Sequence, residues 1–310
     1  MKSYDWRNRH RRATSAAMND PSLHPFGIVG TGRVAQALAL AVAPHSIARP
    51  LLWGRTPDSV RSAATRIGAT AAFSIDRLMA ECDIIAIAVA DDALADVIVD
   101  MAATPPSGRV PFIFHVSGRS GAVVLEPLRA AGALTAAIHP AMTFTGDPEG
   151  EALRMAGARF AITGSTTEAA EQAKHIVKLL GGIAIEIAEE KRALYHAALC
   201  HASNHLVTLI AGAAGALKDA GVDDPSGLLA PLVRAALDNS LAYGFTGLSG
   251  PLLRGDVQTI SDHLDTLSKY SPALLPAYHA MARATLDELK RGATTPSDRL
   301  TALDSLLAVP

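Results

Sequence analysis

The stretch "FGIVGTGRVAQALALAVA" (residues 26–43) decides how this chain is expected to fold. A short apolar run, typical of a buried strand, leads directly into a run with helical periodicity. Between them, Gly30, Gly32 and Ala35 match the pattern G-x-G-x-x-G/A. In this setting Gly30 permits a tight turn, Gly32 lets a pyrophosphate approach the backbone, and Ala35 lets the helix pack on the strand. The segment therefore predicts a nicotinamide dinucleotide site, with the phosphates at the helix N-terminus.

The turn itself is expected to contact the cofactor through Thr31, Arg33 and Val34. The choice between NAD and NADP depends on the end of the second apolar run, "PLLWG", where NAD sites usually carry Asp or Glu for the ribose 2′-hydroxyl. Here Arg55 and Thr56 follow that run. A guanidinium can pair bidentately with a 2′-phosphate, which favours NADP. Asp58 could reverse this choice, and Arg55 could instead be a solvated loop residue.

Further apolar runs alternate with helical patterns along the first 187 residues. Strands are expected at 83–90, 111–117, 134–140, 159–164 and 183–187, and helices at 57–68, 91–103, 122–132 and 167–180. Continuous apolar strands separated by helices predict a mainly parallel, doubly wound sheet covered on both faces, the Rossmann arrangement. From residue 190 the pattern is helical only, with helices expected at 190–219, 225–241, 256–268 and 273–290. We therefore expect a tail at 1–24, a dinucleotide-binding domain at 25–187 and an all-α domain at 188–310.

The composition excludes several classes of protein. Hydrophobic residues make up 49% of the chain, charged residues 19%, and the net charge is −2. The near-neutral balance argues against nucleic acid as the main partner, and no apolar run approaches the ~20 residues that cross a bilayer. Two cysteines, Cys82 and Cys200, indicate a reducing compartment, so we expect a cytoplasmic protein. The basic N-terminus lacks the apolar core of a secretory signal; a flexible tail is expected there, with a transit peptide as the alternative.

Four later motifs carry a resemblance to a known group. They are "HVSGRSG" (115–121), "AIHPAMTF" (137–144), "YHAALCHASNHL" (195–206) and "LSGPLLRGDVQTISDHL" (248–264). Together with the glycine turn, they resemble the oxidoreductases that join a Rossmann domain to a helical C-terminal domain of unknown function. These are relatives of ketopantoate reductases, pyrroline carboxylate reductases and prephenate dehydrogenases. The resemblance implies an NADP-dependent reductase with a C-terminal domain of the phosphogluconate-dehydrogenase-like type.

The expected strand ends carry two candidate catalytic residues, Ser117 and His139, because open α/β sheets gather such groups at the carboxyl ends of their strands. The "IHPAM" segment resembles the His-Pro segment of prephenate dehydrogenases. Ala90 and Asp91, after the third long strand, are expected beside the cofactor. Asp91 and Asp92 fit a turn and a helix N-cap better than a catalytic pair.

The long helix adds a second group of candidates. His196, Cys200 and Asn204 form one i, i+4, i+8 ridge, where ketopantoate reductases carry Lys and Asn instead. His201 and His205 share another face, but the Glu of H-E-x-x-H and a third ligand are missing, so we expect no metal. His196 is the expected proton donor and Asn204 is expected to polarise the substrate carbonyl. Each of these residues could equally be structural.

The resulting hypothesis is an NADPH-dependent reductase of a small 2-keto acid or related carbonyl, with ketopantoate as the best single substrate. Ser117 or Arg254 would hold the substrate carboxylate, and Ser203 and Ser249 would line its site. Imine reduction of the pyrroline carboxylate or opine type is the first alternative, and a non-catalytic NADP-binding protein is the second. A homodimer through the helical domain is expected. The small residues at 211–216 could support close helix contacts there, although internal packing explains them as well.

Overall fold

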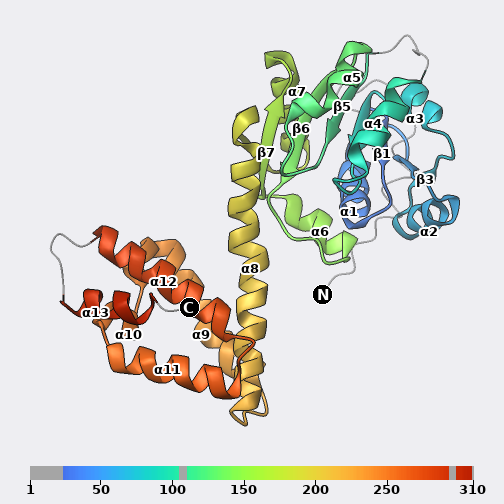
Figure 1. Ribbon diagram of the computed structural model, residues 1–310. Helices are drawn as coiled ribbons and strands as arrows, with labels where there is room; N and C mark the ends of the chain where they lie inside the picture. The colour runs from blue at the N-terminus through green and yellow to red at the C-terminus, as the bar shows by residue number, and fades with distance from the viewer. Residues whose placement is uncertain (1–23, 105–109, 293–297, 309–310) are drawn as a thin grey trace. The chain divides into compact units, whose positions relative to one another are not determined.

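The computed structural model describes residues 24–104, 110–292 and 298–308 (Figure 1). The expected tail at 1–24 lies almost entirely outside these residues. The chain divides into two compact units, Met1–Leu199 and Cys200–Pro310. The division falls inside a helix rather than at residue 188, because the first turns of that helix are held by loops of the first unit.

In the described residues, one sheet of eight strands forms the centre of the first unit, in the order β3-β2-β1-β4-β5-β6-β7-β8. All neighbouring pairs are parallel except β6 and β7, which confirms the mainly parallel, doubly wound sheet. The strand order reverses between β1 and β4, which places the switch point beside the glycine turn. The strands are β1 (Phe26–Val29), β2 (Leu51–Trp53), β3 (Thr70–Ala71), β4 (Ile84–Ile87), β5 (Phe112–His115), β6 (Leu134–Pro140), β7 (Arg159–Gly164) and β8 (Ile183–Glu186).

Helices cover both faces of the sheet (Figure 1). Alternate residues of the same strand enter different cores: Ile28 packs with helices α1, α2, α6 and α7, whereas Val29 packs with α3, α4 and α5. Two buried faces explain why the strands are continuously apolar. These helices are α1 (Arg33–Val42), α2 (Pro57–Ile67), α3 (Ile75–Glu81), α4 (Leu94–Ala102), α5 (Glu126–Ala130), α6 (Pro148–Met155) and α7 (Thr167–Leu179).

Helix boundaries follow from capping side chains. Ser74, Thr166 and Asp256 each accept a hydrogen bond from a backbone N–H in the first turn of the helix that follows. The N-cap expected from the sequence at Asp256 is therefore confirmed. The expected cap at Asp91 or Asp92 is wrong: these residues lie in a turn, and Ala93 takes the N-cap position of α4 without a side-chain bond.

The second unit is helical in its described residues. The long helix α8 (Arg192–Asp219) begins in the first unit and continues into the second. A small core forms around Ile260, Leu286 and Leu303, to which α11, α12 and α13 contribute. The other helices are α9 (Pro225–Tyr243), α10 (Pro251–Arg254), α11 (Val257–Tyr270), α12 (Leu275–Gly292) and α13 (Asp298–Leu306).

Candidate active site

The glycine turn has the geometry that a dinucleotide requires. Gly30 has φ +124°, and a Cβ at this residue would lie 2.2 Å from the carbonyl oxygen of Ala88, so only glycine fits. Gly32 is the N-cap of α1, and a Cβ there would meet no atom within 4 Å. Its backbone is thus open for a phosphate at the N-terminus of the helix. Ala35 is fully buried against the sheet, as the helix contact requires. The three roles expected from the sequence are each compatible with this geometry.

The end of β2 carries the residues expected to select the cofactor. Arg55 and Thr56 are exposed, and Thr56 is the N-cap residue of α2 without a side-chain bond of its own. Asp58, which could have favoured NAD, forms an ion pair with Arg61 one turn later in the helix. Among the described residues, Arg55 makes no ion pair. Its guanidinium group is therefore available at the place where a ribose 2′-substituent would lie.

The loop after β4 contacts the loop after β5. Asp91 forms an ion pair with Arg119 across these loops, with Nε and Oδ2 3.3 Å apart. Both side chains are partly exposed. Ala90 and Asp91 lie at the carboxyl end of β4, next to the switch point, as the sequence predicts for residues near a cofactor ribose.

The loop after β5 is fixed by a buried histidine that the sequence analysis did not single out. The His115 side chain is fully buried; its Nδ1 accepts from the backbone N–H of Ser117, and its Nε2 donates to the carbonyl oxygen of Gly121, 2.8 Å away. Burial lowers the pKa of His115 to about 4, so the imidazole is neutral at pH 7. His115 therefore has a structural role, because its two hydrogen bonds hold the backbone around Ser117 in place.

Arg192, the first residue of α8, fixes the same loop from the other side. Its side chain is 1% exposed, and its guanidinium donates to the carbonyl oxygens of Ser117, Ser120 and Ala161. Desolvation lowers the pKa of Arg192, with partial compensation from Tyr195 and Glu189. The guanidinium is thus occupied by backbone carbonyls, which makes Arg192 a structural residue rather than a substrate anchor.

Two candidate histidines meet at Gly118. A Cβ on this glycine would lie 2.5 Å from Cδ2 of His196 and 2.9 Å from Nε2 of His139. The two imidazole rings pack edge to face, with centroids 6.0 Å apart. Ser117, His139 and His196 therefore converge at the carboxyl ends of β5 and β6, as the sequence predicted for Ser117 and His139. Glycine at 118 is required because both rings occupy the space of a side chain.

Tyr195 joins this cluster. Its hydroxyl lies 2.9 Å from Nδ1 of His139, and its ring lies beneath the guanidinium carbon of Arg192 at 5.7 Å. Burial, together with Arg192 and His196, lowers the pKa of His139 to about 4, and Asp91 opposes this shift. Burial also raises the pKa of Tyr195, which Arg192 partly offsets. At neutral pH the neutral imidazole of His139 is therefore hydrogen-bonded to the protonated phenol of Tyr195.

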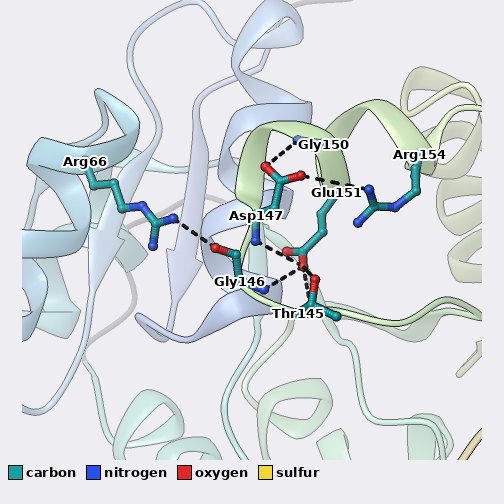
Figure 2. Close-up of polar contacts among 7 residues, drawn as sticks. All are labelled: Arg66, Thr145, Gly146, Asp147, Gly150, Glu151 and Arg154. Atoms are coloured by element: carbon teal, nitrogen blue, oxygen red, sulfur yellow. Dashed lines mark hydrogen bonds and ion pairs between the residues drawn. The ribbon is translucent and has the colours of Figure 1, made fainter. Parts of the chain in front are cut away.

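The loop after β6 is held beside the N-terminus of α1 (Figure 2). One carboxylate oxygen of buried Glu151, Oε1, accepts from the backbone N–H groups of residues 145–147. Arg33 donates to the carbonyl oxygen of Phe144, and Arg66 donates to that of Gly146. The second oxygen of Glu151, Oε2, is buried without a hydrogen-bond partner. The loop at residues 144–147 is thus held next to the first residue of α1.

The remaining site residues expected from the sequence lie in the helical unit. Asn204 is exposed on α8, and its backbone carbonyl accepts from Thr208; Ser203 is half-buried. Ser249 and Arg254 are exposed near α10. Arg254 lines a cavity of about 540 Å³ together with apolar residues of the same unit. These four residues belong to the second unit, whereas the cluster around Gly118 belongs to the first.

His201 and His205 share one helix face, as expected from their spacing. Their Nδ1 atoms are 3.0 Å apart and their rings meet edge to face. In the part of the chain that the structure describes, no group of three His, Cys, Asp or Glu side chains could hold a metal ion.

Two family models match the chain. A Rossmann-like domain matches residues 10–140, and a domain of unknown function, DUF2520, matches residues 158–285. The expected pairing of a Rossmann domain with a helical C-terminal domain of unknown function is therefore confirmed. The second match begins at β7, so it includes the end of the sheet as well as the helices. Among curated protein sequences, none matches this chain.

Solved structures share the fold over nearly their whole length. A Bacteroides fragilis protein assigned as an NADP oxidoreductase is 22% identical, with a TM-score of 0.70 over 85% of this chain and 98% of that one. A Plasmodium falciparum pyrroline carboxylate reductase with NADP bound is 14% identical, with a TM-score of 0.56 over 85% and 97%. An Aspergillus terreus reductive aminase in complex with NADPH is 19% identical, with a TM-score of 0.60 over 91% and 99%.

Proposed function

We propose that this protein is an NADPH-dependent reductase of a small carbonyl compound, with a 2-keto acid such as ketopantoate as the substrate. The observation that carries the proposal is the convergence of Ser117, His139 and His196 at Gly118. This cluster lies at the carboxyl ends of β5 and β6, on the same edge of the sheet as the glycine turn. Structures of similar fold that hold NADP or NADPH support the choice of cofactor.

The bound cofactor would supply a hydride to the carbonyl carbon. The glycine turn would hold its pyrophosphate through the backbone of residues 30–34, and Arg55 with Thr56 would bind the ribose 2′-phosphate. An imidazole next to Gly118 would give a proton to the carbonyl oxygen, and Ser117 would donate a hydrogen bond to the substrate. Asn204, Ser203, Ser249 and Arg254 are proposed as further substrate residues, with Arg254 on the carboxylate.

Imine reduction is the second candidate. The fold is similar to that of a pyrroline carboxylate reductase and of a reductive aminase, and this similarity favours imine reduction. An iminium already carries the proton that a carbonyl must receive, so it needs carboxylate binding but less proton donation. NADPH oxidation measured with ketopantoate and with pyrroline carboxylate distinguishes the two. A protein that binds NADPH but oxidises it with neither compound would support the non-catalytic alternative.

Cofactor binding can be tested at the glycine turn. Gly30→Ala is expected to raise the Kd for NADPH by at least ~10-fold, because the new Cβ would overlap a carbonyl oxygen 2.2 Å away. Gly132→Ala is the matched control, since Gly132 also has a positive φ of +99° but has open space around it. Fluorescence titration with NADPH measures both. Equal affinities in the two variants would remove the glycine turn from the cofactor site.

Arg55→Ala should weaken the binding of NADPH by about 10-fold and leave the affinity for NADH nearly unchanged, because only NADPH carries the 2′-phosphate. The same titrations with both cofactors measure this. A parallel loss for NADH would show that Arg55 supports the loop and does not read the phosphate.

A homodimer through the helical unit is proposed as the form in solution. Large apolar side chains are exposed on α8 and α9, including Val207 at 69% and Leu241 at 79%. The segment Glu189–Asp219 is also long and apolar enough to cross a membrane by length and composition, and none of that window is buried. Asn204, His201 and His205 would fall inside a span, at high cost in lipid. We therefore propose a second copy as the partner and the cytoplasm as the location; light scattering without detergent tests the dimer.

A further inference from the structure

We propose that Tyr195 supplies, through His139, the proton that the substrate oxygen takes up during carbonyl reduction. This inference rests on the proposed reductase function and replaces the expected donor His196 with a two-residue relay. Tyr195 does not touch the substrate in this scheme; it acts through His139 and is therefore a positioning residue.

The geometry places the phenol of Tyr195 and the imidazole of His139 in hydrogen-bond contact. The hydroxyl of Tyr195 is 2.9 Å from Nδ1 of His139, and the two rings pack at 85° with centroids 5.7 Å apart. The other ring nitrogen, Nε2, points to Gly118, where a Cβ would lie 2.9 Å away. If the phenol donates to Nδ1, the imidazole must carry its own proton on Nε2. That proton then lies on the Gly118 side of the ring, at the carboxyl ends of β5 and β6, where the proposed function puts the substrate.

The surroundings of the pair keep the imidazole neutral. Burial, Arg192, His196 and His115 all lower the pKa of His139, to about 4, and only Asp91 raises it. An imidazolium donor is therefore scarce at pH 7. A neutral imidazole can still give its Nε2 proton if another group replaces it at Nδ1 in the same step. Tyr195 is placed to do so.

Arg192 partly offsets the burial that makes the Tyr195 phenol harder to ionise. Its guanidinium lies 5.7 Å from the centre of the Tyr195 ring and lowers the pKa that burial raises. The same cation would stabilise a phenolate. Because three backbone carbonyls hold Arg192 in place, this stabilisation needs no movement of the guanidinium.

The step balances as follows. NADPH, once bound, would supply the hydride for a new C–H bond at the carbonyl carbon, and the π electrons of the C=O bond would move to oxygen. The oxygen takes the proton from Nε2 of His139, and Nδ1 takes the proton from the Tyr195 hydroxyl. The Nδ1 proton then returns to the phenolate, and Nε2 takes a proton from water when the substrate has left, which restores the starting tautomer. The sum is carbonyl, NADPH and one proton giving alcohol and NADP⁺.

The test compares Tyr195→Phe with Tyr278→Phe. The second variant is a matched control, because the Tyr278 hydroxyl bonds to Nδ1 of His263 at 2.7 Å in the helical unit. Ketopantoate and pyrroline carboxylate are the probes, and kcat, KM and the pH profile between about 5 and 9 are measured. Tyr195→Phe should lower kcat for ketopantoate by roughly 100-fold at pH 7 with little change in the Kd for NADPH. Tyr278→Phe should keep the wild-type kcat.

The pH profile separates a relay from a merely structural tyrosine. Without the hydroxyl, His139 must donate as an imidazolium, so the remaining rate of Tyr195→Phe should rise as the pH falls. Wild-type protein should be nearly independent of pH around neutrality. A loss that is equal at every pH, or an equal loss for the imine, would overturn the relay and leave Tyr195 as a packing residue. An unchanged kcat would overturn it as well.

Failure of the proposed function gives a different result. Wild-type protein would then bind NADPH but oxidise it with neither probe. Nitrogen NMR of His139 still tests the relay in that case. A proton on Nδ1 in the wild-type protein overturns it. A proton on Nε2 in the wild type that is shared between Nε2 and Nδ1 in Tyr195→Phe supports it.

Discussion

Two His–Tyr pairs with almost the same geometry occur in different parts of this molecule. His139 and Tyr195 are 2.9 Å apart with rings at 85°, and His263 and Tyr278 are 2.7 Å apart with rings at 82°. The first pair lies at the strand ends, beneath a buried guanidinium and beside a second imidazole. The second pair connects α11 and α12, with His263 exposed. The hydrogen bond is common to both, so it is the surroundings that could give the first pair a chemical role.

The difference in surroundings has a physical basis. At the first pair, burial and nearby cations both act against a charge on the imidazole, whereas Arg192 favours a negative charge on the phenol. At the second pair, burial alone raises the pKa of Tyr278. A pair of groups with opposed electrostatic preferences is typical of acid–base sites.

The largest expected effect comes from removing the cation that distinguishes the first pair. Arg192→Met should lower the free energy of unfolding by about 3–5 kcal/mol, because buried carbonyl oxygens lose their donors. Denaturant melts measure the loss. Arg129→Met is the control, since Arg129 forms an exposed ion pair with Glu126 and should change stability little. If Arg192→Met is as stable as the wild type, Arg192 does not hold the loop after β5 in place.

Acid should weaken the fold through the buried histidines. His115 and His139 have pKa values near 4 in the folded protein, against 6.5 for an ordinary histidine. Their stabilising contribution is complete above pH 6.5 and is lost as the pH falls toward 4, by up to about 3 kcal/mol for each. Denaturant melts at several pH values test this. His139→Gln should reduce the pH dependence, and an identical slope would show that His139 is not buried as neutral imidazole.

The smallest expected effect comes from adding a side chain at Gly118, next to the first His–Tyr pair. Gly118→Ala should lower kcat/KM about 10- to 100-fold, because its Cβ would displace both rings and misplacement of reacting groups is costly. The same substitution should cost less in a His196→Ala background, where the ring 2.5 Å away is gone. Steady-state kinetics of the wild type, the two single variants and the double variant form a double-mutant cycle. Additive losses would show that Gly118 and His196 do not compete for space.

Much of the fold could be predicted because its signals are local. The glycine turn, the long apolar strands and the cap at Asp256 each depend on neighbouring residues. The strand β3 and the helices α3 and α6 were not predicted, because they are short and their apolar patterns are weak. The antiparallel pairing of β6 and β7 was also not predicted, since a helix between two strands normally leads to a parallel crossover.

The candidate site was predictable only in part. Ser117 and His139 follow from the rule that strand ends carry functional groups. Tyr195 could not be predicted although it precedes His196, because its partner His139 is distant in sequence and the contact depends on how α8 meets the sheet. Nothing local marks Arg192 as buried, since arginine is rarely found in protein interiors.

The position of Arg192 in the chain also has a consequence during synthesis. The loop containing Ser117 is translated well before the arginine that binds its carbonyl groups, so a nascent chain that ends before α8 lacks its clamp. We expect the loop after β5 to remain unfixed on the ribosome until α8 has emerged. The sheet can thus form early, whereas the loop after β5 is completed only by the first turn of α8.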